Sequence, residues 1–284
     1  MKKLYCFAGI ELEIEIPDAL MYENERDLGP FRVDSVSHPH RFTFTLKDEL
    51  SEPQGTCIVT QGGLRVYEDN DLSVRYIGSV QQSWDGAYLR VSHKGFEHRA
   101  EVKRSSYTDR IGVQTVLNSL AAEHLTAQHH AVIFHSSYID IGGRGVLFTA
   151  PSGTGKSTQA QLWNIHRGAE ILNGDRAAIR PTNSGVEVCG VPFSGSSQIC
   201  HNRSLPLAAV VYLEQAPQNV IRRLSGSEAF RCIWEGCCVN TWDREDVSVV
   251  SGIIQTLLTT VPVYKLSCLP DASAVAALEG VLNP

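Results

Sequence analysis

A glycine-rich segment between an apolar strand and a helix constrains this chain more than any other feature. Val146–Trp163 reads VLFTAPSGTGKSTQAQLW. It follows the pattern G-x-x-x-x-G-K-[ST], in which backbone N–H groups converge on phosphate oxygens where glycines remove Cβ. A lysine reaches the β and γ oxygens, and a hydroxyl at the start of a helix ligates magnesium. The segment therefore predicts a strand, a nucleotide phosphate loop and a helix, in this order.

The match is incomplete at the first glycine of the pattern. Gly153, Gly155, Lys156 and Ser157 fit it, but Ala150 stands where the first glycine is expected. Alanine fits there when its φ is negative, and Gly153 still supplies conformational freedom inside the loop. The alternative is a tight turn of glycine and serine with a surface lysine.

The composition argues against several classes of function. The 284 residues carry 25 Lys and Arg against 31 Asp and Glu, and no basic block offers a nucleic-acid-binding surface. No run of about eighteen apolar residues predicts a membrane span, and the N-terminal sequence is unlike a signal peptide. The eight cysteines form no C-x-x-C pair, so we expect reduced thiols and a cytoplasmic protein. Cys237 and Cys238 are expected as buried small residues on a helix.

Residues 1–104 are predicted to form strands. The stretches ELEIEI and RFTFTLK alternate polar and apolar side chains, and LSVRYIG and AYLRV continue the pattern. This period of two predicts an antiparallel sheet with one face exposed to water. Glu11, Glu13 and Glu15 are interpreted as that exposed face and not as a metal site.

Residues 105–284 are predicted to mix helices and strands. One helix is expected over DRIGVQTVLNSLAAEHLTAQ, whose apolar residues share a stripe. They are Ile111, Val113, Val116, Leu117, Leu120, Ala121 and Leu125. SYIDIGGRGVLFTA and AAIRPTNSGVEVCG are expected as hairpins, and LAAVVYLE and VPVYKLSC as strands. Helices are expected after the capping box SGSE at 225–228, in DVSVVSGIIQTLL and after Asp271.

The fold class is therefore α+β or α/β. An antiparallel β-rich region, 1–104, precedes a second domain, 105–284, with a mixed sheet and flanking helices. Switch GTPases and motor ATPases differ from this layout, because a later strand in them supplies an apolar run ending in Asp. Here AVVYLEQ, with Glu214, is better interpreted as a plain buried strand, and the guanine-selecting motif N-K-x-D is absent.

A longer segment carries a family resemblance. His135–Thr158, HSSYIDIGGRGVLFTAPSGTGKST, resembles the catalytic core of the HPr kinase/phosphorylase family, which is related in fold to phosphoenolpyruvate carboxykinase. The spacing from His135 to Lys156 agrees with that family without gaps, and RGAEILNGD at 167–175 resembles its R-G-H-x-L-V-x-D-D segment. The resemblance is close over residues 130–180 and absent from the N-terminal region. It implies an HPr kinase-like P-loop domain over 105–284.

The resemblance also implies roles for single residues. Lys156 neutralises phosphate charge, Ser157 and Asp175 ligate Mg²⁺, and His135 lies near the transferred phosphoryl group. The residues implied to bind the nucleotide phosphates are Ser152, Gly153, Thr154, Gly155, Lys156, Ser157 and Thr158. The family's first aspartate, the base on the attacking serine, falls on Gly174. Either Asp175 also orients the acceptor hydroxyl, or the base comes from elsewhere, or activity is lost.

Other parts of the site can only be nominated. Four arginines are candidates for neutralising the transferring phosphoryl group, namely Arg144, Arg176, Arg180 and Arg203. Arg176 is favoured because it follows Asp175, although a solvent-facing arginine on a strand explains it equally well. The segment 192–202, PFSGSSQICHN, suits either a substrate-facing loop or a plain surface connection. Four histidines are interpreted as groups near a helix C-terminus and not as a zinc site, namely His124, His129, His130 and His135.

These expectations favour an ATP- and Mg²⁺-dependent kinase that transfers the γ-phosphate to a serine or similar hydroxyl of a protein or peptide. Relatives of the family include tailoring kinases that phosphorylate ribosomal peptides. A nucleotide-binding protein that recognises a peptide without catalysis is one alternative, and a small-molecule kinase or carboxykinase-type enzyme is another. The acceptor, any phosphatase activity and assembly into a homo-oligomer stay open.

Overall fold

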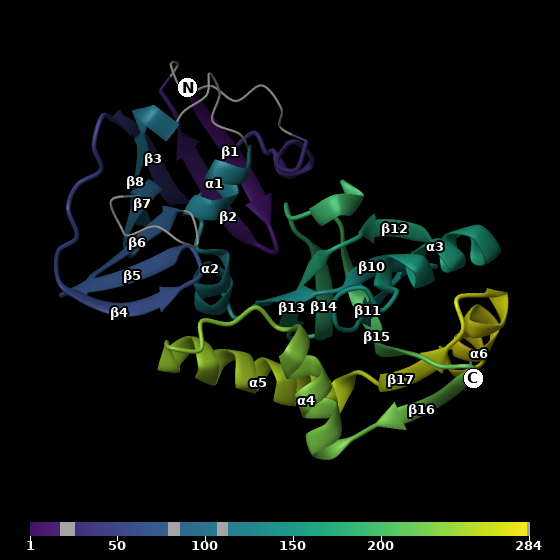
Figure 1. The fold of residues 1–284 in the computed structure, drawn as a ribbon. Coiled ribbons are helices and arrows are strands. Elements are labelled where there is room, and N and C mark those ends of the chain that lie inside the picture. The colour runs from purple at the N-terminus through teal and green to yellow at the C-terminus, as the bar shows by residue number, and fades with distance from the viewer. Residues whose placement is uncertain (18–25, 79–85, 107–112, 283–284) are drawn as a thin grey trace. The chain divides into compact units, whose positions relative to one another are not determined.

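The chain forms two compact units in a computed structural model that describes residues 1–17, 26–78, 86–106 and 113–282 (Figure 1). The units are Met1–Ala122 and Glu123–Pro284. The sequence analysis placed the border after residue 104, and in the structure it follows Ala122. Helix α1 (Val113–Ser119) stays with the first unit because it packs against its strand β7 (Ala87–Lys94), where Asn118 Nδ2 donates to Tyr88 OH over 2.7 Å.

The first unit contains one sheet of eight strands in the order β1-β2-β3-β8-β7-β6-β5-β4. In addition to β7, its strands are β1 (Lys2–Phe7), β2 (Ile10–Glu15), β3 (His40–Lys47), β4 (Thr56–Gln61), β5 (Leu64–Asp69), β6 (Leu72–Gly78) and β8 (Glu97–Lys103). The expectation of a purely antiparallel sheet is wrong, because β3 runs parallel to both β2 and β8. Long connections separate β3 from these partners, and only long connections permit parallel pairing.

Period-two alternation nevertheless orients β2 as the sequence indicates. Leu12 and Ile14 are fully buried. On the opposite face, Glu13 Oε1 lies 2.8 Å from Lys2 Nζ, and Glu11 accepts hydrogen bonds from the backbone N–H groups of residues 37 and 38. The glutamates thus form the polar face of the strand.

The single helix expected over residues 109–128 is two helices in the structure. Helix α1 ends at Ser119, and α2 (Ala122–Gln128) begins three residues later. Ala121 lies between them with a φ of 49°, a left-handed conformation that interrupts a right-handed helix. The predicted residue Ile111 lies outside the described residues.

The second unit contains a mixed sheet in the order β12-β10-β11-β15-β14-β13-β9, with β17 pairing β15 and β16. Its strands are β9 (Val132–His135), β10 (Ser137–Ile141), β11 (Arg144–Thr149), β12 (Glu170–Asn173), β13 (Arg176–Thr182), β14 (Gly185–Gly190), β15 (Ser204–Gln215), β16 (Val220–Leu224) and β17 (Val263–Cys268). The predicted hairpins β10–β11 and β13–β14 form. Gly142 and Gly143 close the first with φ values of 59° and 83°, as a tight hairpin turn requires.

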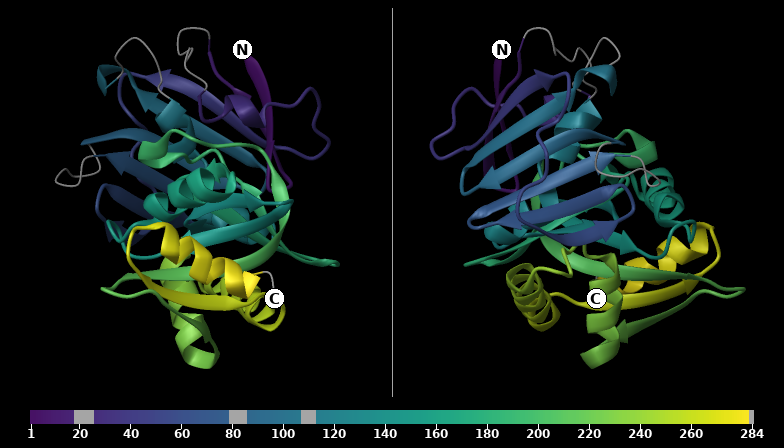
Figure 2. Two further views of the ribbon diagram at one scale, coloured as in Figure 1. Left: turned by 90° about the vertical axis from the view of Figure 1, so that its right-hand side faces the viewer. Right: turned by 60° about the vertical axis from the view of Figure 1, so that its left-hand side comes forward.

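Helices cover both faces of this sheet (Figures 1 and 2). Side chains of α4 (Gly226–Gly236) and α5 (Arg244–Thr260) share one apolar core with β9, β13 and β14. Side chains of α3 (Lys156–Arg167) and α6 (Ala272–Leu282) share another with β10 and β11. Alternate residues of β15 serve the two cores, Val210 the first and Val211 the second.

Two local expectations in the second unit need correction. Ser225 does precede α4, but its side chain makes no capping hydrogen bond, and Glu228 pairs with Arg222 instead. Cys237 and Cys238 follow α4 and do not lie on it. The backbone of Cys237 instead forms an isolated antiparallel β-bridge with Phe134 in β9. Asp271 caps α6 as predicted by accepting the N–H groups of the next turn.

The eight cysteines all lie in the part of the chain that the structure describes, and it joins none of them in a disulfide. Among the residues that the structure describes, no helix combines the length and the apolarity that a membrane-crossing helix needs.

Candidate active site

The loop 150–155 joins the carboxyl end of β11 to the first turn of α3. Gly153 and Gly155 have φ values of 79° and 120°, which side-chain-bearing residues rarely adopt. Ala150 is not among the residues with positive φ, so the condition for alanine at this position is met. The loop therefore has glycine where its backbone requires glycine.

Lys156 is folded back onto this loop. Its Nζ donates to the carbonyl oxygens of Ala150 and Pro151 over 3.0 and 3.5 Å, and the residue is only 8% exposed. Burial lowers the pKa of Lys156, and the negative charge of Asp175 acts to raise it. The neighbouring Ser157 is exposed on the first turn of α3.

Asp175 lies in a turn between β12 and β13 that Asn173 holds in place. Asn173 is fully buried, and its Oδ1 accepts the backbone N–H groups of Asp175 and Arg176 over 2.9 and 3.0 Å. Its Nδ2 donates to the Val191 carbonyl over 3.1 Å. Asn173 was not singled out from the sequence, although the dipeptide Asn-Gly is a turn signal.

Two basic side chains flank the Asp175 carboxylate. His135, at the end of β9, places Nδ1 3.5 Å from Asp175 Oδ1, and Arg176 places Nε 3.3 Å from Oδ2. The guanidinium of Arg176 also lies over the ring of Phe193, 5.5 Å from its centroid. The structure thus brings together His135 and Asp175, two residues that the resemblance nominated.

The surroundings of His135 favour its uncharged form. Burial lowers the pKa of His135, the positive charge of Lys156 lowers it further, and Asp175 acts in the opposite direction. Because an unperturbed histidine titrates near about 6.5, a lowered pKa leaves the imidazole uncharged at pH 7. The charges of Lys156 and Asp175 therefore act on His135 in opposite directions.

A short loop covers the turn at residue 174. The segment 192–199 contains a 3-10 helix, Gly195–Ser197, whose first residue packs so closely that a Cβ on Gly195 would lie 2.6 Å from Asp175 Cγ. A Cβ on Gly174 would overlap the side chain of Ser197. Ser197 therefore occupies the space that an aspartate at position 174 would need.

The four nominated arginines differ in their partners and in their places in the structure. Arg176 contacts Asp175. Arg144 lies at the opposite end of β11 from the loop, Arg180 pairs with Glu187 over 2.9 Å, and Arg203 pairs with Asp140 over 2.6 Å. Arg180 and Arg203 thus each have a carboxylate partner of their own.

Of the four nominated histidines, His124 lies in α2, His129 and His130 follow that helix, and His135 ends β9. In the described part of the chain, one group of three potential metal ligands lies within 4.8 Å, and it contains His124, Asp243 and Asp246. His124 Nδ1 lies 2.9 Å from Asp246 Oδ1, Asp243 caps α5, and Asn240 donates to Asp246 Oδ2 over 2.8 Å. Each carboxylate thus has protein partners, which tie α2 to the start of α5.

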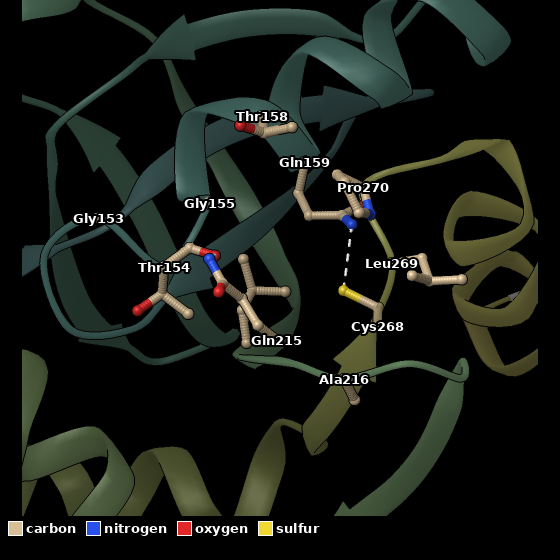
Figure 3. Close-up of a pocket in the computed structure, with 11 residues that line it drawn as sticks. Gly153, Thr154, Gly155, Thr158, Gln159, Gln215, Ala216, Cys268, Leu269 and Pro270 are labelled. Carbon is tan, nitrogen blue, oxygen red and sulfur yellow. Dashed lines mark hydrogen bonds between the residues drawn. The ribbon is translucent and has the colours of Figure 1, made fainter.

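A pocket of about 600 Å³ opens beside the loop (Figure 3). It is lined from three places in the sequence: the loop and α3, the end of β15, and the residues after β17. Glu214 does not line it, because its carboxylate pairs with Lys265 and Ser267 of β17 over 2.8 and 2.7 Å. This agrees with a plain strand at β15.

No protein-family model matches the chain, and no curated protein matches it. Among solved structures, it is similar to the HPr(Ser) kinase/phosphatase from Coxiella burnetii. The similarity covers 52% of this chain and 95% of that one, at 11% identity and a TM-score of 0.31. A likeness at this level establishes neither a shared fold nor a shared activity.

Proposed function

We propose that this chain is an ATP- and Mg²⁺-dependent kinase that transfers the γ-phosphate to a serine or similar hydroxyl of a protein or peptide. One observation carries the proposal: His135 Nδ1 lies 3.5 Å from the carboxylate of Asp175, whose charge also acts on Lys156 of the glycine-rich loop. A phosphate-binding group and an acceptor-orienting group are the two parts that phosphoryl transfer requires.

The loop 150–155 and the first turn of α3 would hold the triphosphate. The first N–H groups of a helix lack helical partners, and the helix dipole favours an anion there. The Lys156 ammonium would exchange the carbonyls of Ala150 and Pro151 for phosphate oxygens.

The exposed hydroxyl of Ser157 and the carboxylate of Asp175 suit Mg²⁺, because both are hard oxygen donors. When bound, this ion would neutralise charge on the phosphates.

In the proposed reaction, the acceptor oxygen forms a bond to the γ-phosphorus while the bond from that phosphorus to the β–γ bridging oxygen breaks. Asp175 accepts the hydrogen bond of the acceptor hydroxyl and takes its proton. The transition state of phosphoryl transfer is loose, so positioning and charge neutralisation outweigh proton removal. One carboxylate is therefore compatible with transfer, although position 174 carries none.

Asp175→Asn tests this proposal. The substitution keeps the size of the side chain and removes its charge, so transfer should fall by about a hundredfold or more while ATP affinity stays close to wild type. Mass spectrometry of a serine-containing candidate peptide after incubation with ATP and Mg²⁺ measures transfer, and calorimetry measures affinity. Asp71→Asn is the matched control, because Asp71 is 86% exposed in the first unit. Normal transfer by Asp175→Asn would refute the assignment.

A second candidate function follows from Ser197. Because its side chain fills the space above Gly174, the site has one carboxylate where the resembled family has two. The chain would then be a nucleotide-binding protein that recognises a peptide without phosphorylating it. Incubation with labelled ATP, Mg²⁺ and candidate peptides separates the two functions. ATP binding with neither labelled peptide nor slow hydrolysis favours recognition, and labelled peptide favours the kinase.

A further inference from the structure

The loop 192–199, which covers the turn at residue 174, is rich in serine. Its sequence is PFSGSSQI, so three hydroxyl groups lie within four consecutive residues. Both ends of the loop are fixed to Asn173, whose Nδ2 donates to the Val191 carbonyl over 3.1 Å and whose backbone bridges to Cys200. The loop is therefore held against the turn that carries Asp175.

The three serines of this loop differ in how their hydroxyl groups are engaged. Ser194 is only 5% exposed. Ser197 Oγ donates to the Ser194 carbonyl over 2.6 Å and accepts the N–H of Ile199 over 3.2 Å. Ser196 is exposed, and its hydroxyl has no hydrogen-bond partner among the residues that the structure describes. Ser196 can therefore act as an acceptor without first losing a hydrogen bond to the protein.

Ser196 directly follows the residue that packs on Asp175. A Cβ built on Gly195 would lie 2.6 Å from Asp175 Cγ. Because consecutive Cα atoms are about 3.8 Å apart, the Cα of Ser196 lies within about 8 Å of the Asp175 carboxyl group. A movement of the loop by a few ångströms is enough to bring the Ser196 hydroxyl within hydrogen-bond reach of that carboxylate.

The loop has a conformation that permits such a movement. Its regular structure is one 3-10 turn, Gly195–Ser197, and the hydrogen bonds of such turns have poor geometry. The turn ends at Gln198, whose φ of 57° is unfavourable for a residue that carries a side chain. Leaving this conformation therefore relieves backbone strain at Gln198.

Arg176 provides a positive charge beside the loop. Its guanidinium contacts the loop through the ring of Phe193, and its Nε lies 3.3 Å from Asp175 Oδ2. The geometry of that ion pair leaves Nε without a hydrogen bond. Because a guanidinium can bind phosphoryl oxygens through two N–H groups, Arg176 suits a phosphoryl group carried by this loop.

We propose that the chain phosphorylates itself on Ser196. The inference rests on the proposed function, because it uses the same ATP, Mg²⁺ and carboxylate. Ser196 Oγ forms a bond to the γ-phosphorus, the bond from that phosphorus to the β–γ bridging oxygen breaks, and ADP leaves. The hydroxyl proton passes to Asp175. Since the serine is tethered to the site, its effective concentration is of the order of millimolar, and the step needs no peptide partner.

Incubation of the purified full chain with ATP and Mg²⁺ tests this proposal. Mass spectrometry should find one added phosphoryl group, and fragmentation of the peptide that contains the loop should place it on Ser196. Asp175→Asn should lower this phosphorylation by about a hundredfold or more, as it should lower transfer to any acceptor. Because one chain is both enzyme and acceptor, the fraction modified at a given time should be independent of protein concentration.

Ser196→Ala should lose the added phosphoryl group, and Ser227→Ala is the matched control. Ser227 is likewise exposed, but it lies on α4, outside the loop, so this variant should be phosphorylated as wild type is. Both variants should bind inorganic tripolyphosphate with wild-type affinity in calorimetry. Equal affinity would show that the loss in Ser196→Ala does not come from a damaged phosphate loop.

A serine-containing peptide, added in a parallel incubation, separates this inference from the proposed function. Phosphate on the peptide and none on the chain would overturn self-phosphorylation and leave the kinase proposal standing. Phosphate on neither would overturn both. Phosphate on another residue of the chain would overturn the assignment to Ser196, and a modified fraction that rises with protein concentration would overturn transfer within one chain.

Discussion

Position 174 shows how one residue can depart from a family pattern for a steric reason. The family resemblance implies an aspartate there, and this chain has glycine. The structure supplies the reason, because any side chain at 174 would overlap Ser197, whose Oγ donates to the Ser194 carbonyl over 2.6 Å. The loop that covers the turn and the glycine beneath it thus fit each other.

Gly174→Asp should therefore destabilise the chain, and Ser197→Gly should offset much of the loss. Overpacking of this kind costs about 1–3 kcal/mol. The free energy of unfolding of the two single variants and the double variant measures the coupling between the positions. If the two substitutions act additively, the loop does not restrict position 174.

Residues of the candidate site differ in how far the sequence can place them. Lys156 and the glycines lie on one continuous segment, so local pattern is enough. His135 and Asp175 meet because β9 pairs with β13, with His135 opposite Arg176, and the resemblance anticipated this meeting. Ser197 could not be recognised, because its surroundings come from a segment distant in the chain.

At the scale of elements, local signals were sufficient where the connection is short. The hairpin β10–β11 and helix α3 form where glycine turns and apolar periodicity predict them. The expected long helix is wrong because Ala121 adopts a left-handed φ that no sequence signal marked. Tertiary packing outweighs helix propensity at such a residue.

The loop before α3 should be sensitive to glycine replacement. Gly155→Ala should cost about 1–3 kcal/mol of stability, because its φ of 120° is strained for alanine, and should also weaken tripolyphosphate binding. Gly168→Ala is the control at the other end of α3, with a φ of 66°. It should lose stability without losing ligand affinity. If both variants lose the same affinity for tripolyphosphate, the loop has no specific part in binding the ligand.

At the scale of the whole molecule, parallel pairing was the part that the sequence could not supply. Alternation marks which face of a strand is buried, but it is silent about the direction of its neighbour. Strand β3 has two parallel partners inside a region that was expected to be antiparallel. The border after Ala122 likewise depends on tertiary packing, because a helix belongs to the unit against which it packs.

Residues 123–284 should fold alone and retain nucleotide binding. This unit contains two apolar cores and every residue that we place in the site. Circular dichroism and a single cooperative thermal transition test folding, and calorimetry with ATP and Mg²⁺ tests binding. A fragment that folds but ignores ATP would show that residues 1–122 contribute to the site.

Strand β15 has a consequence for how this chain matures. Among the described strands, it alone pairs both with β14, which leads to β13 and β9, and with β11, which leads to β10 and β12. A nascent polypeptide on the ribosome therefore cannot join these two groups of strands before residues 204–215 emerge. Any chain that stalls earlier exposes open strand edges, so this step is where chaperones would matter most.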